Sequence, residues 1–354
     1  MKIGILTFTD GTNYGQRLQN YALQTILKSY GHDVYTIQQE HKYSFKHQAK
    51  EIALSVMHPY KATMQKRREA AFSQFNNEYI QFYEELIPEG MSCNDTLKSF
   101  DLFIAGSDQI WNPYSPFVNS NFFMQFAPIN KRASYAASFS VNTIPDEKAQ
   151  TYRRWLSEIP FLSVREKQGV EVIHELTGKR VVQVLDPTLS IDRFVWESMA
   201  RTAICDVPEK KYILSLFLGT DYEDEEKIIV QKTGYELLKF HDFYNLAPDQ
   251  FLKLLKCASL VITDSYHVTI FSIIFNIPFV VFDRKSKGES MSSRFETLDY
   301  LFSIKRRCWS FLSVNQSGFL NNEISLNTLP YIEAKQKSIA FLNTILNGNH
   351  VVSD

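Results

Sequence analysis

Residues 260–275 read Leu260-Val-Ile-Thr-Asp-Ser-Tyr-His-Val-Thr-Ile-Phe-Ser-Ile-Ile-Phe275, an apolar run that ends in polar groups and leads directly into an amphipathic segment. The first three residues are typical of a short buried strand, and Asp264 or Ser265 is suited to cap a helix. The apolar residues that follow recur at helical spacing. The pattern predicts a strand, a polar turn and a helix, as in open α/β sheets.

This prediction places His267 at the start of the helix. In open α/β sheets the ligand binds at the carboxyl ends of the strands, and a helix N-terminus favours anionic groups. A titratable imidazole at that point can exchange protons with a bound anion. The alternative is that the junction serves the fold alone, because many capped junctions between a strand and a helix carry no function.

Length and composition indicate a soluble globular protein of two domains. A chain of 354 residues is long for one hydrophobic core, and its 44% hydrophobic and 22% charged residues are ordinary. The formal net charge of −1 argues against a protein that coats nucleic acid, because such proteins carry a strong basic excess. We therefore expect no nucleic-acid partner.

The cysteines and histidines give no sign of a metal site. Four cysteines lack CxxC spacing, and eight histidines include no HExxH pattern. The apolar run Met1–Phe8 is too short for a signal peptide, and no segment has the roughly 18 continuous apolar residues of a membrane span. We expect free thiols, no metal, no cofactor and a cytoplasmic location, with peripheral contact at the inner face of the membrane as a further option.

The N-terminal residues predict a βαβ unit. A strand over Lys2–Phe8 precedes a polar loop, and apolar residues at helical spacing follow up to Tyr30. Gly31 is placed to end that helix, and Val34–Ile37 forms the next strand. The glycine spacing of the loop matches neither GxGxxG nor a Walker A motif, so the loop is weak evidence for nucleotide binding.

Further polar groups follow other predicted strands. Strand Leu102–Ala105 runs into Gly106-Ser-Asp-Gln-Ile-Trp-Asn-Pro113. Trp111 and Asp108 in this stretch suit a sugar ring, because an aromatic face packs against the C–H groups of the ring and a carboxylate accepts hydrogen bonds from its hydroxyls. Arg165 and Asp186 each follow a predicted strand as well. For such an arginine the alternative is an ordinary surface ion pair.

Residues 42–85 interleave basic and apolar residues and predict a helical insertion. One interpretation is a solvated outer face with an inner packing face. The other is a basic amphipathic surface that rests on an anionic bilayer. The expected domains are 1–190 with this insertion, a linker over 191–210, a second domain over 211–330, and a helix within 331–354 that packs back on the first domain.

Five motifs, in this order, resemble the polysaccharide pyruvyl transferase family and span nearly the whole chain. They are Asn13-Tyr-Gly-x-x-Leu-Gln-x-Tyr-Ala-Leu-Gln24, Gly106-Ser-Asp-Gln-x-Trp-Asn-Pro113, Ser163-Val-Arg-Glu166, Leu185-Asp-Pro-Thr188 and Thr263-Asp-Ser-Tyr-His267. The resemblance implies a fold like that of the GT-B glycosyltransferases, with two Rossmann-like α/β domains facing across a cleft. It also implies transfer of a pyruvyl group from phosphoenolpyruvate to a sugar of a bacterial-type surface polysaccharide, or its lipid-linked oligosaccharide precursor, to give a ketal and phosphate.

This chemistry needs an acid for the methylene carbon, a base for the hydroxyl protons, and cations for the donor's carboxylate and phosphate. By resemblance, His267 is the acid or a phosphate ligand, and Asp186 orients the acceptor or acts as base. The donor-binding candidates are Arg165, Ser265, Lys285 and Arg294. The acceptor-binding candidates are Asn13, Gln16, Asp108 and Trp111.

Three positions depart from the family pattern. Gln16 stands where some branches carry an acidic residue, Ser265 where they carry an arginine, and Val268 where a glycine is more common. We expect Arg294 or Lys285 to supply the missing charge, and Val268 to narrow the approach to the helix N-terminus. Two alternatives stay open, a GT-B glycosyltransferase that uses a nucleotide sugar and a non-catalytic glycan-binding relative.

Overall fold

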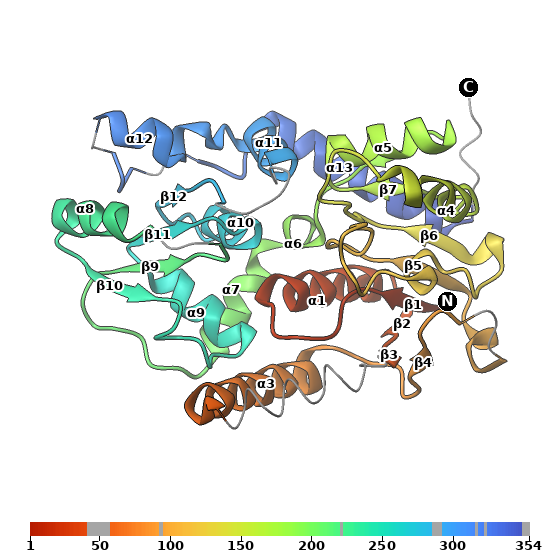
Figure 1. The fold of residues 1–354 in the computed structure, drawn as a ribbon, viewed down its shortest axis with the longest axis horizontal. Coiled ribbons are helices and arrows are strands. Elements are labelled where there is room, and N and C mark those ends of the chain that lie inside the picture. The colour runs from red at the N-terminus through yellow and green to blue at the C-terminus, as the bar shows by residue number, and fades with distance from the viewer. Residues whose placement is uncertain are drawn as a thin grey trace. The chain divides into compact units, whose positions relative to one another are not determined.

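A computed structural model describes residues 1–40, 57–91, 95–219, 222–284, 292–315, 318–321 and 324–348. The chain divides into two compact units, whose elements are labelled in Figure 1. Unit 1 comprises Met1–Lys66, Asn76–Ile191 and Glu333–Asp354. Unit 2 comprises Arg67–Phe75 and Asp192–Ile332.

Unit 1 is built on a parallel sheet in the order β2-β1-β5-β6. Its strands are β1 (Lys2–Leu6), β2 (Asp33–Thr36), β5 (Leu102–Ala105) and β6 (Arg132–Ser134). β5 is buried along its whole length, as expected of an inner strand that is covered on both faces. The predicted βαβ unit is confirmed, because helix α1 (Tyr14–Ser29) connects the parallel neighbours β1 and β2.

The remaining elements of unit 1 are two short parallel pairs and a set of helices. The pairs are β3 (Gln39–Glu40) with β4 (Ile87–Pro88) and β7 (Ser163–Val164) with β8 (Val182–Gln183). The helices are α4 (Asp146–Ser157), α5 (Lys167–Thr177), α6 (Pro187–Ser190) and the 3₁₀ turns η1 (Asp95–Ser99), η2 (Ser120–Phe123) and η3 (Ile129–Lys131). Helix α3 (Pro59–Tyr79) and helix α13 (Leu329–Leu346) each carry residues of both units.

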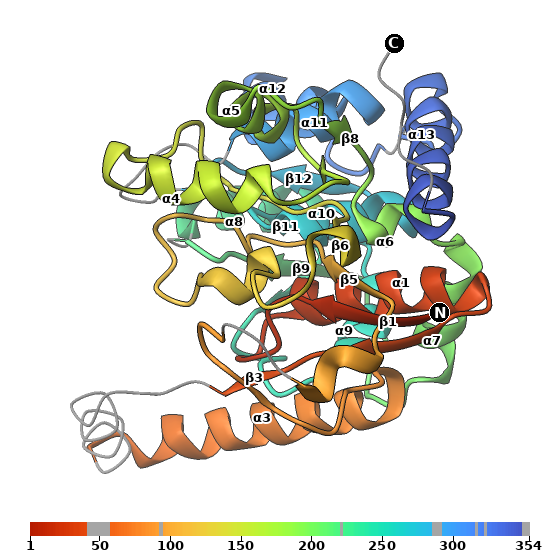
Figure 2. The ribbon, with the colours of Figure 1, turned by 90° about the vertical axis from the view of Figure 1, so that its right-hand side faces the viewer.

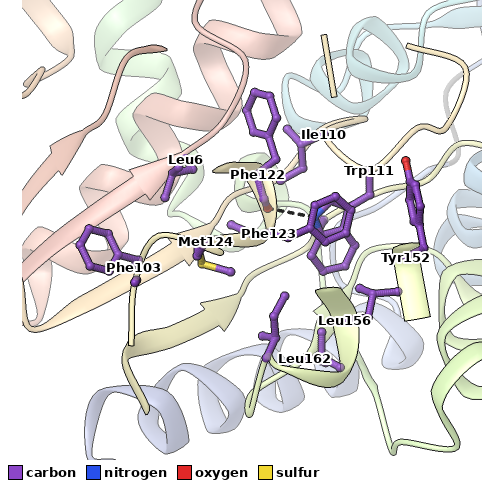
Figure 3. Packing of buried hydrophobic residues seen from close by; sticks show 14 of the residues in the cluster. Leu6, Phe103, Ile110, Trp111, Phe122, Phe123, Met124, Tyr152, Leu156 and Leu162 are labelled. Carbon is purple, nitrogen blue, oxygen red and sulfur yellow. Dashed lines mark hydrogen bonds between the residues drawn. The ribbon is translucent and has the colours of Figure 1, made fainter. Parts of the chain in front are cut away.

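An aromatic cluster lies in the core of unit 1 (Figure 3). The Trp111 ring stacks on the Phe123 ring, with centroids 5.3 Å apart and planes 10° from parallel. The indole nitrogen of Trp111 donates a hydrogen bond of 3.0 Å to the carbonyl oxygen of Phe122. The Tyr152 ring meets Phe123 edge-on. Since the polar atom of Trp111 has a protein partner, this residue is buried without loss of hydrogen bonding.

Helix α13, drawn in blue in Figure 2, adds apolar side chains to the core of unit 1. Phe341, Leu342 and Ile345 belong to the same buried cluster as residues of β1. The hydroxyl of Ser338 accepts a 2.8 Å hydrogen bond from the backbone N–H of Leu185. The last helix of the chain therefore completes the unit in which the chain begins.

Unit 2 contains a second parallel sheet, in the order β10-β9-β11-β12. Its strands are β9 (Tyr212–Leu216), β10 (Glu236–Lys239), β11 (Leu260–Thr263) and β12 (Phe279–Val281). Its helices are α7 (Arg193–Thr202), α8 (Glu223–Thr233), α9 (Pro248–Cys257), α10 (Tyr266–Ile274), α11 (Ser292–Phe302), α12 (Trp309–Asn315) and the 3₁₀ turn η4 (Ile304–Arg307). Helix α7 occupies half of the stretch in which we expected a linker.

The predicted strand, turn and helix over 260–275 are present as β11 and α10, and the N-cap is one of the two expected residues. Ser265 takes the N-cap position without a side-chain capping hydrogen bond. The Asp264 carboxylate instead accepts hydrogen bonds from the backbone N–H groups of Leu218, at 2.7 Å, and Gly219, at 2.9 Å. It also pairs with Arg284 at 3.1 Å. Asp264 thus ties the end of β11 to the end of β9.

Helix α13 supports a stability prediction. Leu342→Ala is expected to lower the free energy of unfolding by about 2–5 kcal/mol, because it removes a buried side chain from the core of unit 1. Ile339→Ala is the control, since that side chain is exposed on the same helix, and a change of no more than about 0.5 kcal/mol is expected. Urea unfolding followed by circular dichroism measures both. Equal effects of the two variants would contradict the packing of α13.

Candidate functional site

A pocket of about 370 Å³ lies in unit 1, where the N-terminus of α1 meets the loops after β1 and β5. Asn13, Gln16 and Asp108, three of the four predicted acceptor-binding residues, line it. Asp10 and Gln109 add polar groups, and Phe8 and Phe117 add aromatic surface. The structure thus brings together residues that are nearly 100 positions apart in the sequence.

The N-terminus of α1 forms one wall of this pocket. The side chain of Asn13 occupies the N-cap and accepts a 3.3 Å hydrogen bond from the backbone N–H of Gln16. This bond uses one of the donors that a helix start leaves without an intrahelical partner. The side chain of Asn13 is therefore positioned by the helix that it caps.

The buried guanidinium of Arg17 holds the loop after β1. It donates hydrogen bonds to the carbonyl oxygens of Phe8 at 3.3 Å, of Gly11 at 2.7 Å and of Thr9. Burial lowers the pKa of Arg17 to about 10, an effect that the negative charge of Asp10 partly offsets. No sequence pattern indicates this role, because it depends on three backbone carbonyls converging on one side chain.

Asp108 follows β5 and has a left-handed backbone with a φ of 77°. Such a conformation costs a non-glycine residue on the order of 1–3 kcal/mol and occurs often at functional sites. It is held by a 3.0 Å hydrogen bond from the backbone N–H of Ser138 to the carbonyl oxygen of Asp108. The Asp108 side chain is 8% exposed, and its carboxylate oxygen lies 3.6 Å from the guanidinium of Arg165.

Arg165 is fully buried within a cluster of three carboxylates. Its guanidinium lies 2.8 Å from Asp186, 3.6 Å from Asp108 and 3.6 Å from Glu166. A buried charge needs compensating partners, because it has lost its hydration. In this structure the charge of Arg165 is matched by protein carboxylates, and its expected grip on the donor anion stays a prediction.

Asp186 is also fully buried, and both of its carboxylate oxygens accept hydrogen bonds. One oxygen accepts from the Ser107 hydroxyl at 2.9 Å and pairs with Arg165 at 2.8 Å. The other accepts from the backbone N–H of Thr188 at 3.0 Å and from its hydroxyl at 2.6 Å. In this structure Asp186 supports Arg165, and its expected role toward the acceptor stays a prediction.

Glu166 belongs to this cluster, although it is not among the site residues predicted from the sequence. Its carboxylate accepts hydrogen bonds from the Ser138 hydroxyl at 2.7 Å and from the backbone N–H of Phe139 at 3.1 Å. Ser107, which donates a hydrogen bond to Asp186, is also absent from the predicted site residues. Both residues directly follow or adjoin predicted strand ends, so position at the carboxyl edge of the sheet was the signal that could have found them.

The prediction that Trp111 stacks on a sugar is wrong. Its side chain is 0% exposed and lies in the aromatic cluster of Figure 3, where it stacks on Phe123. Its indole N–H is bonded to the backbone, so no face or polar atom is presented to a ligand. Aromatic residues at the pocket are Phe8 and Phe117 instead.

Unit 2 holds the other predicted residues. His267 lies in the first turn of α10 and is 9% exposed, with its ring edge-on to Tyr266 at 5.2 Å. The guanidinium of Arg294 lies 5.6 Å from the centre of the same tyrosine ring, within cation–π range. Ser265 directly precedes Tyr266 and is buried, and Lys285 lies outside the described residues.

Val268 is buried in unit 2, at 3% exposure. Its side chain therefore packs inside the unit. Because Val268 lies within helix α10, its backbone does not need the left-handed conformation that glycine adopts readily. Among the described residues, no group of three or more His, Cys, Asp or Glu could hold a metal ion. In the same part of the chain, no helix has the length and apolar content needed to cross a bilayer.

The chain is similar in structure to a UDP-N-acetylglucosamine 2-epimerase, with a TM-score of 0.50, 11% identity, and coverage of 100% of this chain and 98% of that one. A putative enzyme of the same name from Listeria monocytogenes gives a TM-score of 0.49 at 10% identity, covering 100% and 97%. At this identity the similarity concerns the fold alone. The predicted GT-B-like α/β fold class, with two parallel sheets, is confirmed.

Comparison with curated proteins finds no match in sequence. The family model described as polysaccharide pyruvyl transferase matches residues 13–286, which is most of the chain. The matched segment contains the pocket residues from Asn13 onward, the carboxylate cluster around Arg165 and the start of α10. The chain belongs to the polysaccharide pyruvyl transferase family, and this membership implies a transferase activity.

Proposed function

We propose that the protein transfers a pyruvyl group from phosphoenolpyruvate to a sugar of a surface polysaccharide, such as an exopolysaccharide or capsule, or to its lipid-linked precursor. The product is a pyruvate ketal, and phosphate is released. The observation that carries the proposal is the family match over residues 13–286. Phosphoenolpyruvate is a substrate in this scheme, and no cofactor is required.

The pocket of unit 1 supports the acceptor half of the proposal. Asn13 and Gln16 supply amide groups and Asp108 a carboxylate, which suit the hydroxyls of a sugar. Phe8 and Phe117 supply aromatic surface for the apolar face of the ring. A volume of about 370 Å³ lies within the usual range for small-molecule sites, roughly 300–1,000 Å³.

The start of α10 supports the donor half. Phosphoenolpyruvate carries a carboxylate and a phosphate, and helix N-termini favour anions. Arg294 supplies a positive charge next to Tyr266 in this region, and His267 supplies an imidazole that can give a proton to the methylene carbon. We assign His267 as the acid or phosphate ligand, and Ser265 and Arg294 to the donor.

Acceptor-dependent phosphate release tests the proposed reaction. The purified protein is incubated with phosphoenolpyruvate and a panel of galactosides, mannosides and N-acetylhexosamines, free and lipid-linked. We expect phosphate to appear only with an acceptor that has two suitably placed hydroxyls, together with a product heavier by one pyruvyl ketal in mass spectrometry. Release of a nucleoside diphosphate from a sugar nucleotide, or glycan binding without turnover, would contradict the proposal.

His267→Gln is expected to lower kcat by about 10²- to 10⁴-fold, because glutamine keeps the polar group but cannot protonate carbon. His241→Gln is the matched control, since His241 is an exposed histidine of the same unit. Steady-state kinetics with the identified acceptor measures both variants. Full turnover by His267→Gln would remove this histidine from the acid role.

Helix α3 supports a contact with the membrane surface, as a lipid-linked acceptor requires. Just before and within its first turns, Met57 is 63% exposed and Tyr60 is 74% exposed. Lys61, Lys66 and Arg67 are exposed nearby, and the sequence from 57 to 68 contains no acidic residue. Exposed apolar side chains flanked by cations suit an anionic bilayer, where each cation near the surface contributes about 1 kcal/mol.

Vesicle flotation tests this contact. We expect the protein to float with vesicles rich in phosphatidylserine and to remain unbound with phosphatidylcholine alone. The double variant Tyr60→Ser, Lys61→Glu should bind at least tenfold more weakly, because it removes apolar area and reverses a charge. Lys232→Glu, an exposed charge reversal on α8, should bind like the original protein. Equal flotation of both variants, or none of the original protein, would rule out this surface.

A further inference from the structure

We infer that Asp108 is the general base that takes the proton of the attacking sugar hydroxyl, an inference that rests on the proposed pyruvyl transfer. Besides Asp10 in the loop after β1, two carboxylates at the carboxyl edge of the sheet are candidates for this task, Asp108 and Asp186. The Asp186 carboxylate is fully buried, and both of its oxygens accept hydrogen bonds from protein groups. Asp108 lines the pocket and retains some exposure. Of these two, Asp108 alone has access to a ligand; Asp10 also lines the pocket, but it is an exposed loop residue, whereas the largely buried Asp108 is fixed by its backbone.

The hydrogen bonding of the two carboxylates supports this choice. Within the described residues, no protein group donates a hydrogen bond to the Asp108 carboxylate, whose one close ionic partner is Arg165 at 3.6 Å. A base must have lone pairs available toward its substrate, at hydrogen-bonding distance from the proton it accepts. The carboxylate of Asp108 has them, whereas the oxygens of Asp186 are occupied by Ser107, Arg165 and Thr188.

The backbone at Asp108 holds the carboxylate at the pocket. Its φ of 77° lies in the left-handed region, which Asp adopts more readily than most residues but which still carries strain. A parallel bridge pairs Asp108 with Ala137, so the strained residue is fixed by the continuation of the sheet. Strain of this kind persists where the surrounding structure over-determines a residue, and it is frequent at active sites.

The buried cluster beneath the pocket makes Arg165 a positioning residue. One nitrogen of its guanidinium is bound to Asp186, and another faces Asp108. Glu166 lies on the third side, and is itself fixed by the Ser138 hydroxyl and the Phe139 N–H. Because each partner of Arg165 is anchored to a different strand end, the guanidinium has a fixed direction. It therefore orients the Asp108 carboxylate without contacting substrate.

The proton balance of the reaction is consistent with this role. One sugar hydroxyl bonds to C2 of phosphoenolpyruvate and gives its proton to Asp108, while the electron pair of the C=C bond takes a proton from the acid to form the methyl group. The second hydroxyl then bonds to C2, and the C2–O bond to phosphate breaks. The proton of the second hydroxyl and the proton held by Asp108 go to the acid and to the departing phosphate. Asp108 and the acid therefore return to their starting protonation states.

Asp108→Asn tests the base directly. Asparagine has the same size and adopts the left-handed region readily, so the fold should be kept. We expect kcat to fall by about 10²- to 10⁴-fold while the acceptor KM changes by less than about threefold. Asp10→Asn removes a carboxylate from the same pocket and should alter KM without a comparable loss of kcat.

Chemical rescue provides a second measurement. Asp108→Gly accepts the same backbone conformation and leaves space for a small carboxylate. Added formate should raise its kcat at least tenfold, with no effect on the original protein. A kcat for Asp108→Asn within threefold of the original, or a raised KM alone, would overturn the base role, as would a lack of rescue. If the original protein shows no acceptor-dependent phosphate release, the proposed transfer itself fails, and the base role fails with it.

Discussion

The ion pair between Arg165 and Asp186 is the interaction on which the rest of unit 1 depends. Two opposite charges are buried 2.8 Å apart, where loss of either partner typically costs about 3–5 kcal/mol. Asp186 sits after β8, Arg165 after β7, and the Ser107 that joins them after β5. Parallel strands bring these carboxyl ends to one edge, so a stable ion pair and a pocket arise from the same topology.

Much of this arrangement could be predicted from the sequence. Apolar runs and their spacing predict the strands and helices, because burial of one face sets their period. Polar residues directly after strands predict which groups share an edge, and Asn13, Gln16 and Asp108 do line one pocket. Helix α1 (Tyr14–Ser29) is found where apolar residues recur at helical spacing up to Tyr30.

The remainder depends on tertiary contacts that a linear pattern does not contain. Trp111 lies two residues after pocket-lining Gln109, yet its ring turns into the core because Phe123 offers a stacking partner. Asp186 looks like a reactive carboxylate in sequence, and only its neighbours reveal that both oxygens are engaged. The left-handed backbone of Asp108 is likewise set by pairing with Ala137, a contact 29 positions away. The competition between packing and exposure decides each of these cases.

In the proposed reaction a sugar hydroxyl adds to phosphoenolpyruvate while the methylene carbon of phosphoenolpyruvate gains a proton. Running the reaction in D₂O and examining the product by NMR and mass spectrometry tests it most directly. We expect a ketal whose methyl group carries deuterium from solvent, with one phosphate released for each ketal formed. A product that retains a vinyl group or phosphate, or a ketal methyl without deuterium, would contradict it.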